Sequence, residues 1–228
     1  MKLEHYIASQ TTLSRRRILD LLKAGRILVN NTPPSSLLMP INLKKDTIMV
    51  DNKVIKPEIS RLYYKFNKPD HVISTLDDPK GRPCLKEFMK QVPEQLFPVG
   101  RLDRHSTGLL LFTNDGEFAN KILHPKYSLL KTYQVTLEKT LKILDIKRLQ
   151  AGFFLSDGPC AFEDIDILAP NRCIVTLSQG RNRIVRRMFE HLGYVVQRLH
   201  RLSIGNIYLG DLKPGKFRRF MKNELPLN

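Results

Sequence analysis

Two short apolar stripes open the chain. Their apolar positions recur three and four residues apart, the spacing of one helix face: Leu3, Tyr6 and Ile7, then Ile18, Leu21 and Leu22. The second helix is predicted to begin after Ser14, whose hydroxyl can cap the first turn, and to end at Gly25. A strand at 27–29 and a hairpin at 47–55 follow. Residues 1–57 are therefore expected to form a small helical and β-structured module.

Short β-rich runs alternate with helices from residue 61 onward. Seven runs have strand character: 62–66, 72–74, 109–112, 133–137, 161–168, 174–178 and 195–199. Helical patterns lie between them at 85–91, 117–123, 141–150 and 184–192. Several connections are too short for parallel crossovers, which favours a mixed, mostly antiparallel sheet with flanking helices. The predicted fold class is therefore α+β, with residues 61–228 as a second domain beyond a boundary at 56–60.

Charge narrows the range of partners. Lys and Arg number 38 against 22 Asp and Glu, a formal net charge of +16, which favours a polyanionic partner. No apolar run approaches the roughly 18 residues of a membrane-spanning helix, and no signal peptide follows Met1. We therefore expect a cytoplasmic protein that does not associate with membranes.

The sequence contains no motif that is typical of a metal site or of a nucleotide-cofactor site. Cys84, Cys160 and Cys173 are far apart and lack C-x-x-C spacing, and the histidines form no H-x-x-x-H or H-E-x-x-H pair. Neither glycine-rich phosphate loop, G-x-x-x-x-G-K-[ST] or G-x-G-x-x-G, occurs. The sequence therefore predicts no metal site and no cofactor.

An arginine triplet stands at the start of the second predicted helix. Arg15, Arg16 and Arg17 lie in its first turn, where the helix dipole disfavours cations. A solvated charge run is the plain interpretation, and contact with a phosphate backbone is the other. With Gly25 and Arg26 the triplet gives a pattern, S-R-R-R followed by G-R-[IV]-x-V-N, that resembles the S-four-type RNA-binding module over about residues 1–56. The resemblance implies that Arg15, Arg16, Arg17 and Arg26 bind structured RNA.

The densest polar cluster surrounds Asp103, in a loop between two apolar runs. Arg101 and Arg104 flank the aspartate, and Gly100 and Gly108 bracket the loop where close backbone approach is possible. A carboxylate held by arginines stays ionised and suits a nucleophile or a general base. A salt bridge in a surface turn is the alternative interpretation.

Three ordered motifs give a more specific resemblance. The run G-R-L-D-x-x-[ST]-x-G-L-[LV]-L-x-T-[ND]-D-G at 100–116 resembles the catalytic loop of the RsuA/RluB family of ribosomal RNA pseudouridine synthases. The second signature of that family, K-x-Y-x-V, is matched by Lys131, Tyr133 and Val135, and the third by residues 180–189. The resemblance spans nearly the whole chain, including the first module.

The resemblance implies a role for each matched residue. Asp103 corresponds to the catalytic aspartate that attacks the uridine, with attack on the sugar, attack on the base and simple proton removal all left open. Tyr133 corresponds to the ring that stacks on the target uracil, and Arg101 to the residue that helps open or fill the RNA helix around the flipped base. Arg186 corresponds to the basic partner of the catalytic carboxylate, with the adjacent Arg187 as the alternative.

The third motif places charge on a predicted helix. Four charged residues share the face opposite its apolar stripe: Arg183, Arg186, Arg187 and Glu190. The stretch 178–219 holds 10 basic and 2 acidic residues, which suits an RNA backbone. RNA binding is accordingly assigned to arginines of this stretch and of the aspartate loop: Arg101, Arg181, Arg183 and Arg187. A solvated face on which Glu190 pairs with Arg186 is the alternative, and Tyr133 taken alone would equally suit strand packing.

The implied activity is the isomerisation of uridine to pseudouridine, carried out by a monomer on ribosomal RNA or a pre-ribosomal particle without a cofactor. Large-subunit rRNA is slightly favoured, because 77–83, 157–159 and 180–183 look like the large-subunit members of the family. Gln179 and Ile184 depart from the family pattern. One rival function is a non-catalytic RNA-binding or ribosome-assembly protein. The other is an RNA methyltransferase, and the absence of a glycine-rich cofactor loop argues against it.

Overall fold

The computed structural model describes residues 1–11, 13–56, 61–92 and 96–221. By its internal contacts the chain divides into two compact units, Met1–Leu62 with Asn114–Gly116, and Tyr63–Thr113 with Glu117–Asn228. Most of the boundary predicted at 56–60 lies outside the described residues. No described helix is long and apolar enough to cross a membrane.

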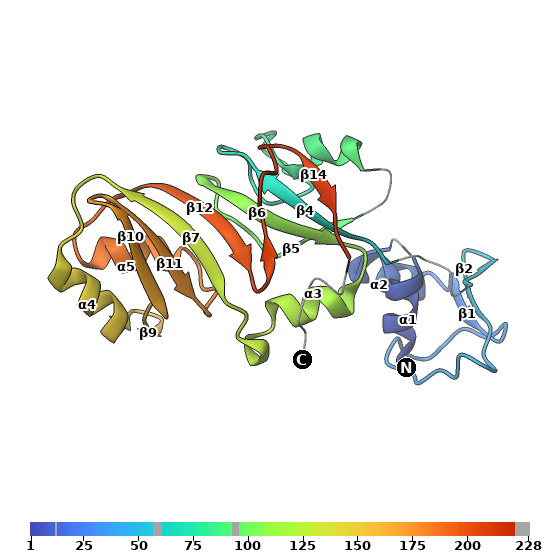
Figure 1. The fold of residues 1–228 in the computed structure, drawn as a ribbon. Helices are drawn as coiled ribbons and strands as arrows, with labels where there is room; N and C mark the ends of the chain where they lie inside the picture. Colours follow the sequence, from blue (N-terminus) through green and yellow to red (C-terminus); the bar gives the residue numbers. More distant parts are fainter. Residues whose placement is uncertain (12, 57–60, 93–95, 222–228) are drawn as a thin grey trace. The chain divides into compact units, whose positions relative to one another are not determined.

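The described part of the first unit contains two helices and three short strands (Figure 1). Their bounds are α1 Leu3–Gln10, α2 Arg15–Lys23, β1 Ile27–Val29, β2 Ile48–Val50 and β3 Lys53–Val54. As predicted, the Ser14 hydroxyl accepts a hydrogen bond from the Arg17 backbone N–H at 3.2 Å, and Gly25 follows α2 with a φ of +67°. The hairpin between β2 and β3 turns at Asp51 and Asn52, both in the left-handed region that such tight turns require.

Nine strands of the described chain form the sheet of the second unit. In sheet order they run β10, β11, β7, β12, β6, β4 and β14, with β5 paired to β6 and β13 to β12. Their bounds are β4 Tyr63–Lys68, β5 Phe97–Val99, β6 Ser106–Thr113, β7 Lys131–Leu137, β10 Asp164–Ala169, β11 Arg172–Leu177, β12 Val196–Ile204, β13 Ile207–Tyr208 and β14 Phe217–Arg219. The strands β8 Phe153–Leu155 and β9 Gly158–Cys160 form a separate hairpin.

Helices cover parts of this sheet. The α-helices are α3 Gly116–Leu123, α4 Ile143–Ala151 and α5 Ile184–His191, and the 3-10 helices are η1 Leu85–Gln91 and η2 Pro125–Tyr127. Figure 1 shows α4 and α5 at the β10–β11 end of the sheet and α3 beside β5 and β6. The strand predicted at 72–74 was wrong, because Ile73 makes only an isolated bridge to Cys84. The helix predicted at 85–91 is present as the tighter 3-10 form.

The predicted α+β class with a mixed, mostly antiparallel sheet is confirmed. Among the described strands β6 and β12 pair in parallel, and the other pairs in this sheet are antiparallel. Gly108 makes this parallel contact possible, because a Cβ at its position would lie 2.3 Å from the Arg201 carbonyl oxygen. One apolar core packs α5 against β7, β11 and β12, and another packs α3 against β4, β5 and β6.

Candidate active site

A cavity of about 700 Å³ opens in the second unit where the three sequence motifs meet. Arg101 and Asp103 reach it from the loop before β6, Tyr133 from β7, and Arg181 and Arg183 from the segment before α5. The structure therefore brings together five of the residues that the sequence selected.

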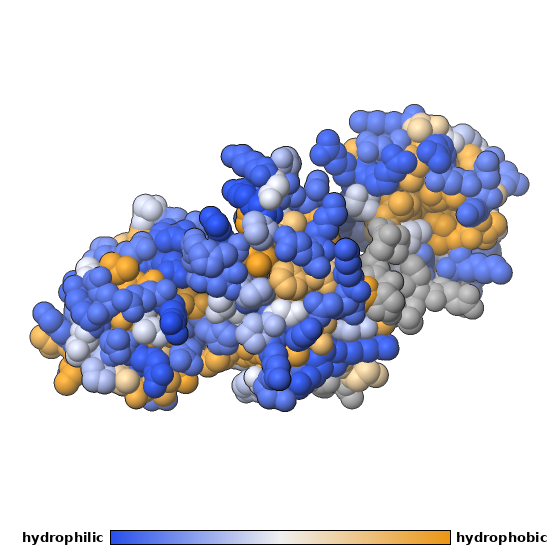
Figure 2. Space-filling model, turned by 90° about the horizontal axis from the view of Figure 1, so that it is seen from above, coloured by the Kyte–Doolittle hydropathy of each residue, from blue (hydrophilic) through white to orange (hydrophobic). Residues whose placement is uncertain are grey.

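Positive charge dominates the wall of this cavity. Among its described lining residues Asp103 is the acid, and five are basic: Arg101, Lys131, Arg181, Arg183 and Arg201. In the view of Figure 2, hydrophilic side chains also cover most of the visible face of the second unit. Such a wall favours an anionic ligand.

Buried side chains hold the backbone of the Asp103 loop. The Ser74 hydroxyl donates to the Leu102 carbonyl at 2.7 Å and accepts from the Leu102 N–H at 3.0 Å. Lys68 is fully buried, and its ammonium donates to the Ser106 carbonyl at 2.8 Å. Asp103 is half-buried, and its own carbonyl accepts from the Ser106 N–H at 3.0 Å. The loop is thus fixed by side chains from β4 and the segment after it.

Lys68 is a site residue that sequence reasoning missed. Burial lowers the pKa of its ammonium to about 8, against the opposing charges of Asp70 and Asp103. The available signal was a lysine at the end of an apolar strand run, just before Pro69. The sequence does not indicate that this lysine lies beside the carbonyls of the Asp103 loop; the fold does.

Stability is expected to depend on pH through Lys68. Its folded pKa of about 8 lies below the 10.5 of an ordinary lysine, so between these values the unfolded chain binds a proton that the folded chain has lost. The contribution of Lys68 to the free energy of unfolding should therefore rise with pH across this window. Urea unfolding near both ends of the window, for the unchanged protein and Lys68→Met, measures the difference. If the free energy of unfolding depended on pH equally in the two proteins, the lowered pKa of Lys68 would be contradicted.

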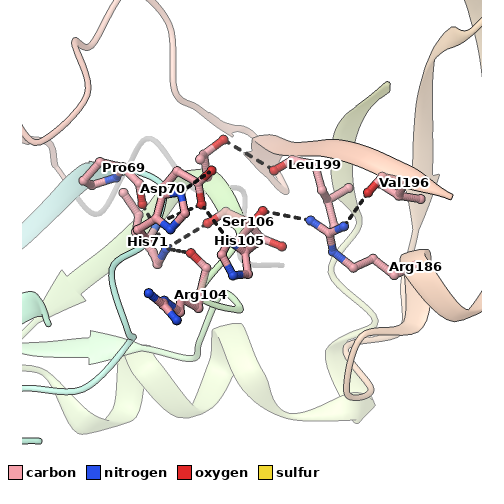
Figure 3. A network of polar contacts seen from close by, with 11 residues as sticks. Pro69, Asp70, His71, Arg104, His105, Ser106, Arg186, Val196 and Leu199 are labelled. Atoms are coloured by element: carbon pink, nitrogen blue, oxygen red, sulfur yellow. Dashed lines mark hydrogen bonds and ion pairs between the residues drawn. The ribbon is translucent and has the colours of Figure 1, made fainter. Parts of the chain in front are cut away.

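Arg186 was predicted on the helix face opposite the apolar stripe, and its side chain is buried there. The side chain is 7% exposed, with Nη1 donating to the Val196 carbonyl at 2.7 Å and Nη2 to the His105 carbonyl at 2.8 Å (Figure 3). Glu190 pairs instead with Arg183, at 3.4 Å. Arg186 therefore ties α5 and β12 to the Asp103 loop.

The predicted pairing of Arg186 with Asp103 is not a direct contact. Within the described residues no ion pair or hydrogen bond joins the two side chains, because the guanidinium bonds to the two carbonyls. The charges still interact: burial lowers the pKa of Arg186, the like charge of Arg183 lowers it further, and Asp103 raises it. Asp103 also raises the pKa of Lys68. The carboxylate is thus an electrostatic neighbour of two buried cations.

Arg187 binds a carboxylate elsewhere. Its Nη2 lies 2.7 Å from Asp157 Oδ2, and Arg181 Nη1 lies 2.8 Å from Asp157 Oδ1, at the turn between β8 and β9. Arg181 lines the described cavity and Arg187 does not. Of the two adjacent arginines, Arg186 is therefore the one that contacts the Asp103 loop.

Tyr133 stands opposite Arg201 on the neighbouring strands β7 and β12. The tyrosine is half-buried, the guanidinium carbon lies 6.0 Å from its ring centroid, and a long 3.5 Å contact joins Arg201 Nη1 to Tyr133 Oη. Arg201 is only 5% exposed, and its Nε donates to the Leu109 carbonyl at 2.7 Å. Sequence reasoning missed Arg201, although it shares the strand face of the apolar Leu199 two residues earlier.

The arginines assigned to RNA in the first unit lie on its surface. Arg15 approaches Glu4 at 3.3 Å, and Arg26 pairs with Asp51. Exposure is shared by the whole set: Arg15, Arg16, Arg17 and Arg26. The core of this unit is built from apolar residues and includes none of these arginines. Because they are exposed, their side chains are accessible to a binding partner.

One group of possible metal ligands occurs among the described residues. Asp70, His71 and His105 bring ligand atoms within 4.8 Å of one another (Figure 3). All three are exposed, and none lines the cavity. Motif searching missed the group because its members come from two separate loops. Asp70 lies 3.4 Å from His105 and 3.7 Å from His71, so contacts of the carboxylate with the two imidazole rings account for the arrangement.

Comparisons with known proteins agree on one family. The sequence profile described as RNA pseudouridylate synthase matches residues 63–191. An uncharacterized RNA pseudouridine synthase of Aquifex aeolicus is 38% identical over 99% of this chain and 92% of its own length. Ribosomal large subunit pseudouridine synthase B of Bacillus subtilis is 35% identical over 98% of this chain and 93% of its own.

A solved structure agrees with these relatives. The crystal structure of a pseudouridylate synthase superposes with a TM-score of 0.70 at 29% identity, covering 98% of this chain and 97% of that one. The similarity thus runs through both units and through the segments that line the cavity. The chain therefore belongs to the RNA pseudouridine synthase family and is an RNA uridine isomerase.

Proposed function

We propose that the protein converts uridine to pseudouridine in ribosomal RNA, with Asp103 as the catalytic carboxylate. The observation that carries this proposal is that Asp103 and Tyr133, from separate motifs, line one cavity with five basic side chains. The Bacillus subtilis relative is named for the large ribosomal subunit, which favours large-subunit rRNA as the substrate. A half-buried carboxylate in a basic cavity also favours catalysis over the rival function of passive RNA binding.

The reaction exchanges one bond to the ribose for another. The N1–C1′ bond breaks, a C5–C1′ bond forms, C5 loses its proton and N1 gains one. The oxidation state is unchanged, so the step itself requires no redox partner. It does require a carboxylate near the sugar or the ring and a surface that retains the detached base.

Each part of the cavity wall supplies one requirement. The target uridine must leave its stack, and Arg101, Arg181 and Arg183 can bind phosphates on either side of it. Tyr133 offers an aromatic face to the extruded base. Asp103 offers the carboxylate, held in place by the side chains that fix its loop.

Pseudouridine mapping tests this assignment. Ribosomal RNA from a strain that lacks the gene should miss a defined pseudouridine, which the unchanged gene restores and the Asp103→Asn gene does not. A missing site in small-subunit rRNA would correct the substrate. An rRNA map that does not change would contradict rRNA as the target.

Tyr133 should act through its ring more than through its hydroxyl. Tyr133→Leu should lose about 1–3 kcal/mol of base stacking, whereas Tyr133→Phe should keep its RNA affinity. A slower chemical step in Tyr133→Phe would report a role for the hydroxyl that contacts Arg201. Single-turnover rates and filter binding measure both quantities, with thermal unfolding as the control. Full activity in both variants would show that Tyr133 serves only packing.

For the first unit, we propose an S-four-type RNA-binding domain that adds backbone contacts to structured rRNA. The exposed arginines on and after α2 support this role, as does the arrangement of two short helices and a small sheet. Phosphate contacts of this kind position an RNA without reading its bases.

Replacing Arg15, Arg16 and Arg17 together by Gln should weaken RNA binding and flatten its salt dependence. The slope of log affinity against log salt should fall by about 0.7–0.9 for each phosphate that the variant no longer binds, while the single-turnover rate at saturating protein changes little. The matched control replaces three exposed basic residues at and near α4: Lys142, Lys147 and Arg148. A slope equal to that of the unchanged protein would show that the triplet is a solvated face.

A further inference from the structure

Lys131, Tyr133 and Arg201 form one wall of the cavity. Lys131 and Tyr133 are two residues apart on β7 and therefore share a face of the sheet. Arg201 is the β12 residue that pairs with Tyr133. All three line the cavity together with Asp103. An aromatic ring and two cations thus lie next to one another on this wall.

Within the described part of the chain no carboxylate pairs with the charges of this wall. The Lys131 ammonium donates to the carbonyls of Leu129 at 2.7 Å and Ser178 at 2.9 Å, and no described carboxylate pairs with it or with Arg201. Burial lowers the pKa of Lys131 to about 8, with a further lowering by the Arg201 charge. A bound anion would offset this repulsion.

Arg201 also has a donor without an acceptor. Its Nη2 is buried and has no hydrogen-bond partner among the described residues. A buried N–H without a partner costs free energy, so a cavity-lining arginine with such a donor indicates an acceptor on the bound ligand. On a uracil stacked against Tyr133, the available acceptors are O2 and O4.

Resting on the function proposed above, we propose that Arg201, with Lys131 beside it, binds the carbonyl oxygens of the target uracil and stabilises the negative charge of the detached base. When the N1–C1′ bond breaks, its electron pair stays on the base and spreads over N1, O2 and O4. The ring must then turn before C5 can join C1′, and a half turn about the N3–C6 axis exchanges O2 with O4. The same donors therefore have an acceptor before and after the turn.

Substitution of Arg201 tests this role on the full-length protein, with an rRNA transcript that carries the mapped uridine. Arg201→Met should lower the single-turnover rate at saturating protein by about 100-fold or more, the effect of removing a donor to a developing anion, at nearly unchanged RNA affinity. Lys131→Met should show a smaller loss of the same kind. Arg198→Met is the matched control, since Arg198 is exposed on the same strand and outside the cavity lining.

Replacing a uracil carbonyl oxygen by sulfur tests whether Arg201 contacts the base. A target residue of 2-thiouridine or 4-thiouridine replaces one carbonyl oxygen by a weaker acceptor that also spreads anionic charge better. Contact with the base predicts that the rate ratio of unchanged protein to Arg201→Met shrinks for at least one thio substrate. A merely structural role would not produce this coupling. If Arg201→Met does not fold, Arg201→Lys, which keeps a buried cation, carries the same comparison.

Three results would overturn the proposal. Equal rate ratios for all three substrates would make Arg201 a structural residue. Weaker RNA binding with a flatter salt dependence, at an unchanged saturated rate, would make it a phosphate contact. Absence of pseudouridine formation by the unchanged protein would overturn the proposed function and this inference with it, which distinguishes that failure from the first two.

Discussion

Asp103→Asn is expected to bind the rRNA target and to form no pseudouridine. In the proposed mechanism the carboxylate takes part in the bond changes, whereas affinity is expected to come mainly from the basic side chains of the same cavity. Loss of an essential nucleophile or base lowers enzyme rates by about 10⁴-fold or more, and this is the effect we expect. Release of tritium from RNA labelled at C5 measures the rate, and filter binding measures the affinity.

A second aspartate supplies the control for this experiment. Asp211 is exposed, lies 2.7 Å from Arg218 and does not line the cavity, so Asp211→Asn should change neither quantity. Turnover by Asp103→Asn above the trace expected from deamidation would contradict the catalytic assignment. A large loss of affinity would show instead that Asp103 organises the binding surface.

Arg186→Ala should be the most damaging substitution outside the cavity lining. It leaves the carbonyls of Val196 and His105 without their buried donor, at a cost of about 2–5 kcal/mol in the free energy of unfolding. It also releases the loop that positions Asp103, and a shift of about 1 Å in a catalytic group can cost about 100-fold in rate. We therefore expect both a lower unfolding temperature and a rate loss of two or more orders of magnitude, measured where the variant is still folded.

Arg187→Ala separates this effect from a general loss of charge on α5. That variant removes the 2.7 Å contact to Asp157 and leaves the loop bonds in place, so its rate should fall far less. Arg186→Lys keeps a cation and should recover part of the stability. A larger rate loss in Arg187→Ala than in Arg186→Ala would move the positioning role to Arg187.

Local signals carried most of the fold prediction. The cap at Ser14 and the hairpin at 47–55, which turns at Asp51 and Asn52, depend on a few neighbouring residues, and both are present. The strand predicted at 72–74 failed because the backbone there leaves the sheet and Ser74 bonds to Leu102 instead. A short apolar run in the sequence does not indicate whether its backbone pairs within the sheet or leaves it.

The buried cation Arg201 could not be predicted, since its burial depends on strand order. Arg201 bonds to Leu109, 92 positions away, and contacts Tyr133, 68 positions away, because β12 lies between β6 and β7. Helical periodicity placed Arg186 opposite the apolar stripe of its helix, and only the fold shows that the carbonyls of Val196 and His105 cover its side chain. Asp103 and Tyr133 were found because they belong to short motifs.

The parallel pair of β6 and β12 also sets when activity can emerge as the chain folds. Antiparallel neighbours build each half of the sheet, starting from β4 with β6 in one and from β7 with β11 and β12 in the other. The cavity takes Asp103 from the first half and Tyr133 and Arg201 from the second. The β6–β12 pair joins residues about 90 positions apart, such as Ser106 and Leu199, and contacts so distant in sequence form slowly. A refolding chain should regain most of its secondary structure early and its enzymatic activity only with the slowest phase.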